Sequence, residues 1–209
     1  MKWLLAILAV FALGSGGFAR TATTPAAIAA VYFNDTRINQ IGTYLHGNAA
    51  ECVAKGGLSK EQAREIDRSI DRYVVEAKKI VPEMQADFVA AIPELLSEKE
   101  MADLRDFFNS SAGRSFMDAI TKPTRIVAAS QMRFCAAQTQ LAFDPNNIVQ
   151  DAIAALSPPD RDILRKFAST PSAKKISSIN EAVGETDAKY KNKFELAATT
   201  AGLTRWIVK

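Results

Sequence analysis

Apolar side chains recur at helical spacing along almost the whole chain. They return every three or four residues, and no long segment alternates apolar and polar positions as a half-buried strand does. The first such stripe follows Thr24-Pro25, a capping residue before a proline at the first helical position. It runs toward Gly56-Gly57, where the helix is predicted to end. Its members are Ile28, Val31, Ile38, Ile41 and Leu45.

Two further helix starts carry a capping box, a serine followed three residues later by Gln or Glu. Ser59 with Gln62 opens a helix that breaks or bends at Pro82, and a short helix over 83–92 stops before Pro93. Ser97 with Glu100 opens the next helix, which is predicted to end near Asn109.

Prolines and turn residues divide the second half of the chain. Asp144-Pro145-Asn146-Asn147 predicts the clearest loop, and Ser157 followed by two prolines predicts another helix start. We therefore expect an all-α bundle of about eight helices. Its remaining segments are 111–122, 124–143, 148–156, 160–169 and a last one from 171, with breaks at Gly184 and Gly202.

The first nineteen residues have the pattern of a secretory signal peptide. A lysine at position 2 precedes an uninterrupted apolar run from Trp3 to Leu13, and small residues at Gly17 and Ala19 form a cleavage site. Eleven residues rise only about 16 Å as a helix, roughly half the thickness of a bilayer core. The pattern predicts cleavage near Ala19 and export, with the bacterial periplasm as the destination. Residues 20–209 would then form a single all-α domain.

Composition narrows the class of protein. The chain has 209 residues, 48% of them hydrophobic and 23% charged, which excludes wholesale disorder, collagen-like repeats and a polytopic membrane protein. A net charge of +3 is too small to indicate a nucleic-acid surface. We expect no nucleic-acid partner.

The chain has two cysteines, Cys52 and Cys135. An oxidising compartment permits a disulfide, and a single pair is the simplest outcome. The alternative is two separate buried thiols that pack as small apolar side chains. Neither cysteine lies in a C-x-x-C motif or beside a histidine, so a catalytic thiol is disfavoured.

Two segments resemble each other at a constant offset of 60 residues. Leu96-Ser97 matches Leu156-Ser157, and the similarity continues through the helix that follows. The pattern predicts a duplicated helix-turn-helix unit, with copies over about 96–143 and 156–203. Chance similarity between two amphipathic helices is the alternative. The other matched pairs are Leu104 with Leu164, Arg105 with Arg165, Phe107 with Phe167, Ser110 with Thr170, Arg114 with Lys174 and Phe116 with Ile176.

A segment within the first copy resembles a family signature. The segment FFNSSAGR is similar to the pattern F-[YF]-x-S-P-x-G-[KR] of the exported bacterial family called domain of unknown function 2059. Ser111 stands where that family usually has proline, and the similar region covers about 82–123. The resemblance implies an all-α exported protein and brings no activity with it. The residues that carry it are Phe107, Phe108, Ser110, Gly113 and Arg114.

The second copy of the motif keeps the proline as Pro171 but has Ala173 in the place of glycine. A serine or threonine before proline caps the next helix, and a glycine at a crowded turn lets two helices approach closely. We therefore interpret the motif as a structural turn. The alternative is an anion site built from the N–H groups of 111–113 with Arg114.

Other candidate chemistry is sparse. His46 is the only histidine, and Glu51, five residues on, lies on a different helical face, so a metal site is not expected. The sequence has no G-x-S-x-G, phosphate loop or H-E-x-x-H motif. We expect no catalytic residues, cofactor or metal. Carboxylate pairs that could serve a hydrolase are Glu98 with Glu100, Asp103 with Asp106, and Asp160 with Asp162.

The function that these patterns favour is non-catalytic binding in the bacterial envelope. The expected ligand is a partner protein or a small apolar molecule held in a groove between helices. The rival is an envelope hydrolase that uses paired acidic residues. A third alternative is weak contact between the membrane surface and the basic segment 160–209, which ends in the apolar Trp206-Ile207-Val208.

Overall fold

The protein is all-α. The computed structural model describes residues 24–130, 132–138 and 145–208, and the predicted signal peptide lies outside them. None of the described residues lies in a β-strand. The helical segments are α2 (Thr24–Tyr32), α3 (Asp35–Ala54), α4 (Lys60–Lys78), α5 (Val81–Leu95), α6 (Glu98–Asn109), α7 (Ser111–Ser130), α8 (Pro145–Ala155), α9 (Pro158–Ala168), α10 (Pro171–Lys174), α11 (Ile176–Thr200) and a 3-10 turn, η1 (Thr204–Trp206).

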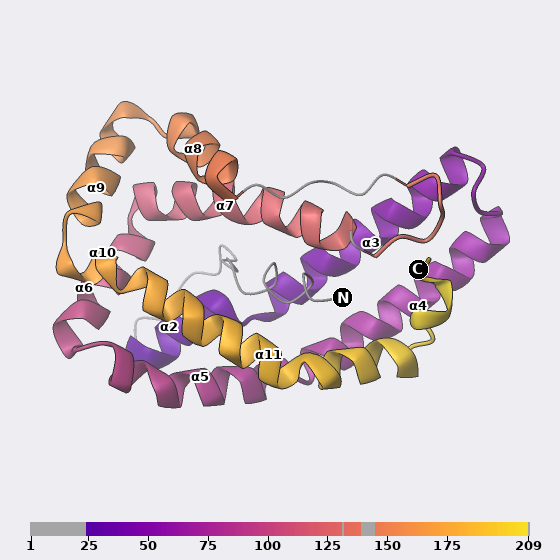
Figure 1. Cartoon of the computed structure of the whole chain (residues 1–209), viewed down its shortest axis with the longest axis horizontal. Coiled ribbons are helices and arrows are strands. Elements are labelled where there is room, and N and C mark those ends of the chain that lie inside the picture. Colours follow the sequence, from indigo (N-terminus) through magenta and orange to yellow (C-terminus); the bar gives the residue numbers. More distant parts are fainter. Residues whose placement is uncertain (1–23, 131, 139–144, 209) are drawn as a thin grey trace.

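The helices form an elongated bundle (Figure 1). Helices α3 and α4 form a hairpin, α7 packs along α3, and α11 packs against α5 and α4. Helices α6, α9 and α10 gather at the opposite end from the α3–α4 turn, and the C-terminus lies beside α4. The apolar face of each helix is thereby buried against at least one neighbour.

The predicted capping boxes are present. The Ser59 and Ser97 hydroxyls each accept a hydrogen bond from the backbone N–H three residues on. In return, the side-chain oxygens of Gln62 and Glu100 accept hydrogen bonds from the backbone N–H groups of Ser59 and Ser97. Two helices end near a glycine, as expected. Gly56 and Gly202 have φ angles of 72° and 74°, in the left-handed region that favours glycine at the end of a helix. The sequence therefore marked these helix ends correctly.

Several predicted boundaries are wrong. The first stripe is two helices, because the Asn34 side chain accepts a hydrogen bond from Arg37 N at 2.9 Å and caps α3. Pro93 does not stop α5, which continues to Leu95. Helix α7 likewise runs through Pro123 to Ser130. Gly184 lies inside α11 instead of breaking it.

The predicted long helix over 124–143 is also absent. Helix α7 ends at Ser130, and residues 132–138 form bends and turns. Of the loop predicted over 144–147, residues 145–147 belong to the first turn of α8. Position 131 and positions 139–144 lie outside the described residues.

The largest core side chains meet where α2 packs on α5. The Phe88 ring lies 5.7 Å from that of Tyr32 and 5.3 Å from that of Phe33, in tilted and edge-on arrangements. Ile28 and Ile92 are buried in the same cluster. This packing fixes α2 against the end of α5, where a cleft opens.

Candidate functional site

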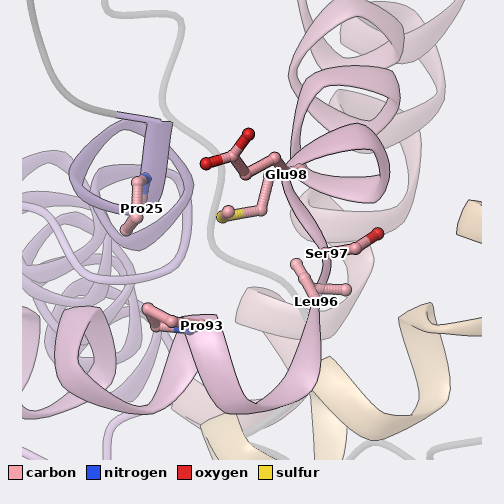
Figure 2. Close-up of a pocket in the computed structure, with 6 residues that line it drawn as sticks. Pro25, Pro93, Leu96, Ser97 and Glu98 are labelled. Carbon is pink, nitrogen blue, oxygen red and sulfur yellow. The ribbon is translucent and has the colours of Figure 1, made fainter.

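A cleft of about 630 Å³ opens at the corner between α5 and α6, facing the start of α2. Figure 2 shows the side chains of Pro25, Pro93 and Leu96 around it, with the Glu98 carboxylate extending over it. The volume lies within the range of small-molecule sites. The lining residues are Pro25, Pro93, Leu96, Ser97, Glu98 and Met101.

Local sequence builds this corner. The chain turns at Leu96, which is extended, and Ser97 then caps α6. Glu100 accepts hydrogen bonds from Ser97 N at 2.9 Å and Ser97 Oγ at 2.8 Å, and these bonds lower the pKa of the Glu100 carboxyl. Glu98 is the first residue of α6, and its side chain makes no hydrogen bond or ion pair with any described residue. The cleft therefore presents apolar surface and one unpaired carboxylate.

The two other carboxylate pairs are engaged in structural contacts. Asp103 accepts from Ser172 Oγ at 2.7 Å, which lowers the pKa of Asp103, and Asp106 pairs with Arg105. Asp160 accepts from Ser111 and Ser157, both at 2.7 Å, and Asp162 pairs with Arg165. Of the six carboxylates in the three candidate pairs, only that of Glu98 lines the cleft.

A buried ion pair lies elsewhere, between α3 and α11. Arg37 Nη2 is 3.2 Å from Asp187 Oδ2, and the two residues are 8% and 6% exposed. Burial raises the pKa of Asp187, and the Arg37 guanidinium offsets only part of that rise. Burial also raises the pKa of Tyr73 to about 12, again opposed by Arg37. Because the pair joins α3 to α11, we interpret it as a clamp between the two helices.

His46 bridges α3 and α4 at the surface. Its Nδ1 is 2.7 Å from Asp67 Oδ1 and its Nε2 is 3.1 Å from Asp71 Oδ1. Both ring nitrogens are thus engaged by carboxylates of α4, so the imidazole links the two helices. Within the described residues no group of three or more His, Cys, Asp or Glu side chains could hold a metal ion.

The family-like motif forms the turn between α6 and α7. Ser110 Oγ donates to the Phe107 carbonyl oxygen at 2.6 Å and accepts from Gly113 N at 3.0 Å. Arg114 donates to the Asn109 carbonyl oxygen across the same turn. The Asp160 carboxylate, bonded to Ser111 Oγ, lies at the start of α7, where an external anion would have to bind.

The second motif makes the same bonds before α10. Thr170 Oγ1 donates to the Phe167 carbonyl oxygen at 2.7 Å and accepts from Ala173 N at 3.2 Å. The Phe107 and Phe167 rings stack with centroids 3.9 Å apart and planes 3° apart. Figure 1 shows the two turns facing each other at one end of the bundle.

Gly113 is required by close approach of the backbone. A Cβ atom there would lie 2.0 Å from the Phe107 carbonyl oxygen, whereas one at Gly47 in α3 would meet nothing within 4 Å. We expect Gly113→Ala to lower the free energy of unfolding by about 1–3 kcal/mol. The matched control, Gly47→Ala, should raise it by about 0.5–1 kcal/mol. Chemical denaturation measures both, and equal changes in the two variants would contradict the close approach.

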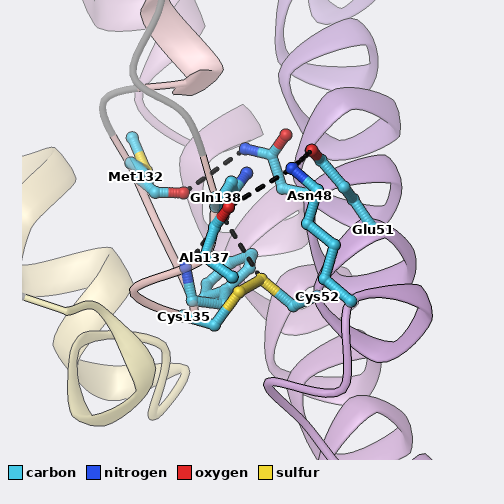
Figure 3. Close-up of a disulfide and its surroundings, with 9 residues drawn as sticks. Asn48, Glu51, Cys52, Met132, Cys135, Ala137 and Gln138 are labelled. Atoms are coloured by element: carbon cyan, nitrogen blue, oxygen red, sulfur yellow. Dashed lines mark hydrogen bonds and ion pairs between the residues drawn. A yellow bond between two sulfur atoms is a disulfide. The ribbon is translucent and has the colours of Figure 1, made fainter.

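The Cys52–Cys135 disulfide ties the segment 132–138 to α3. The sulfurs are 2.08 Å apart, so the predicted bridge is present. The Asn48 side chain donates to the backbone carbonyl of Met132 at 3.3 Å (Figure 3), and the Lys55 side chain donates to that of Ala137 at 3.2 Å. A Cβ at Gly57 would lie 2.8 Å from Cys135 Cβ, so only glycine leaves room for the bridge.

The C-terminal residues pack near this segment. Val208 N donates to the Arg133 carbonyl oxygen at 2.8 Å, and Trp206 and Ile207 pack against the core. No helix among the described residues is both long enough and apolar enough to cross a bilayer. The apolar end of the chain thus contributes to the bundle's packing.

Comparison with known proteins finds no match to this chain among family models, curated proteins or solved structures. Function must therefore be argued from the site itself.

Proposed function

We propose that this chain is a non-catalytic binding protein of the bacterial envelope and that the cleft between α5 and α6 takes a small apolar ligand. The observation that carries the proposal is the lining, in which Pro25, Pro93, Leu96 and Met101 surround a single carboxylate. Glycoside hydrolysis by paired acidic residues needs two carboxyl groups placed on either side of the bond, and of the candidate pairs only Glu98 lines this cleft. Binding of an apolar body needs the surface that this cleft offers.

Two features support a location in the envelope: the signal-peptide pattern of residues 1–19 and the Cys52–Cys135 disulfide. Residues 1–19 have the three regions of a signal peptide, and a disulfide is typical of proteins outside the reducing cytosol. We propose that cleavage near Ala19 releases the chain into the periplasm.

We also propose that the α6–α7 and α9–α10 segments are two copies of one unit. Their turns make equivalent hydrogen bonds, and they exchange reciprocal contacts: Ser111 at the start of α7 bonds Asp160 of α9, and Ser172 of α10 bonds Asp103 of α6. We further propose that the chain belongs to the domain of unknown function 2059 family, because residues 107–114 resemble that family's pattern. In this proposal the paired turns form the rigid end of the bundle that supports the cleft.

The binding proposal is tested with N-phenyl-1-naphthylamine, a neutral apolar dye that fluoresces when it leaves water. We expect saturable binding of one dye per chain to the wild-type protein. Pro93→Trp fills the cleft and should abolish that binding, whereas Glu94→Trp adds the same side chain at the next exposed position, outside the lining, and should leave it intact. Absence of saturable binding, or equal binding by the two variants, would contradict the proposal.

A further inference from the structure

The cleft carries a charge that its own protein does not neutralise. Of its polar lining groups, Ser97 Oγ is already bonded to Glu100, while the Glu98 carboxylate has no partner among the described residues. Figure 2 shows that carboxylate extended over the space between Pro25 and the α5–α6 corner. A ligand with a positive group beside its apolar body would pair with Glu98 without displacing any existing contact.

The charged groups around the cleft also favour a positively charged ligand. The nearest lysine on α6, Lys99, is turned away, since its Nζ is 3.2 Å from Asp103 Oδ2. Glu94, on the last turn of α5, is exposed and adds a second negative charge, and the carbonyl end of α5 carries a partial negative charge. The starts of α2 and α6 contribute partial positive charge, but at α6 Glu98 and Glu100 offset it. Lys175 lies close enough to act on Glu100, but among the residues that line the cleft the one formal charge is the negative charge of Glu98.

We propose that the cleft selects small amphiphilic cations, molecules with an aliphatic body and one ammonium group, and that Glu98 confers the selectivity. This inference rests on the proposed binding function. The aliphatic body contacts Pro25, Pro93, Leu96 and Met101, and the ammonium group donates hydrogen bonds to the Glu98 carboxylate. Because Glu98 is exposed, the preference over a neutral ligand of the same shape is modest.

The test compares three probes with one aliphatic chain: n-octylammonium, n-octanol and n-octanoate. Calorimetric titration of the wild-type protein at low salt should give affinities in that order, with octylammonium about 2- to 5-fold above octanol. Added salt should reduce the preference. Glu98→Gln should remove the preference, so that octylammonium and octanol bind with equal affinity, and the matched control Glu94→Gln, outside the lining, should retain most of it.

The outcomes separate this inference from the function on which it rests. If octanol binds in the cleft as tightly as octylammonium, or if Glu98→Gln keeps the preference, the inferred selectivity is overturned while the binding function stands. If none of the three probes binds, or if Pro93→Trp binds them as the wild type does, the binding function itself is overturned. Circular dichroism of each variant verifies that it remains helical.

Discussion

Removal of the Cys52–Cys135 bridge is expected to lower the free energy of unfolding by about 4–5 kcal/mol. The cysteines are separated by 83 positions, and closing so long a loop restricts the unfolded chain strongly. The expected fall in melting temperature is about 10–20 °C for a chain of this size. The double variant Cys52→Ala/Cys135→Ala and the wild type treated with a phosphine reductant should both show the loss.

The same variant should loosen a defined part of the molecule. Once the bridge is gone, residues 132–138 keep their hydrogen bonds to α3 and to Val208 and the burial of Phe134, but lose their covalent tie to α3. Amide hydrogen exchange should therefore rise first in 132–138 and in the C-terminal residues, while α6 and the turn at Ser110 stay protected. Equal stability of the oxidised and reduced proteins would contradict the structural role of the disulfide.

Arg37→Met is expected to lower the free energy of unfolding by about 3–5 kcal/mol at neutral pH. The change leaves the Asp187 carboxylate buried without the guanidinium that it contacts at 3.2 Å. Asp187→Leu in the same chain removes that stranded charge, so the double variant should recover most of the loss. Chemical denaturation of both single variants and the double variant gives the coupling, and additive losses would contradict the buried pair.

The cost of Arg37→Met should also depend on pH. Burial already raises the pKa of Asp187 above its ordinary value of 3.8, and loss of Arg37 raises it further. Below the ordinary value the carboxyl is protonated in both the folded and the unfolded chain, so the charge contributes no loss. As the pH rises through the raised pKa, the folded protein loses stability relative to the unfolded chain. The variant should therefore be closest to wild type in acid.

Local signals predicted the fold class and many helix ends. Ser59, Ser97, Gly56 and Gly202 act through bonds or backbone angles within a few residues of themselves, so sequence alone reveals them. Compartment and cysteine count predicted the disulfide without any knowledge of the fold. These predictions needed no tertiary information.

The wrong boundaries arise where tertiary contacts decide the local structure. Cys135 was expected in a helix, but the bridge and the hydrogen bonds from Asn48 and Lys55 hold its segment across α3. Pro93 lies in the last turn of α5, where only a few further helix bonds can be lost. Helix α7 keeps Pro123 while packed against α3, α6, α8 and α9.

The candidate site was harder to predict than the fold. The cleft joins the start of α2 to residues about 70 positions later, and nothing local to Pro25 or Glu98 indicates that they meet. The sequence indicates the buried ion pair only indirectly. Asp187 lies between Val183 and Tyr190 on the buried face of α11, where a charge requires a partner of opposite sign. That pattern indicates a buried ion pair but does not identify Arg37.

Native mass spectrometry of the full chain expressed in a bacterium, with the periplasmic and cytosolic fractions measured separately, tests the central claim most directly. An exported, disulfide-linked binding protein should begin at Arg20, lack two hydrogen atoms relative to the dithiol form, and bind one n-octylammonium ion, with Pro93→Trp binding none. A protein that stays in the cytosol with residues 1–19 attached and two free thiols, and that takes up no octylammonium, would contradict it.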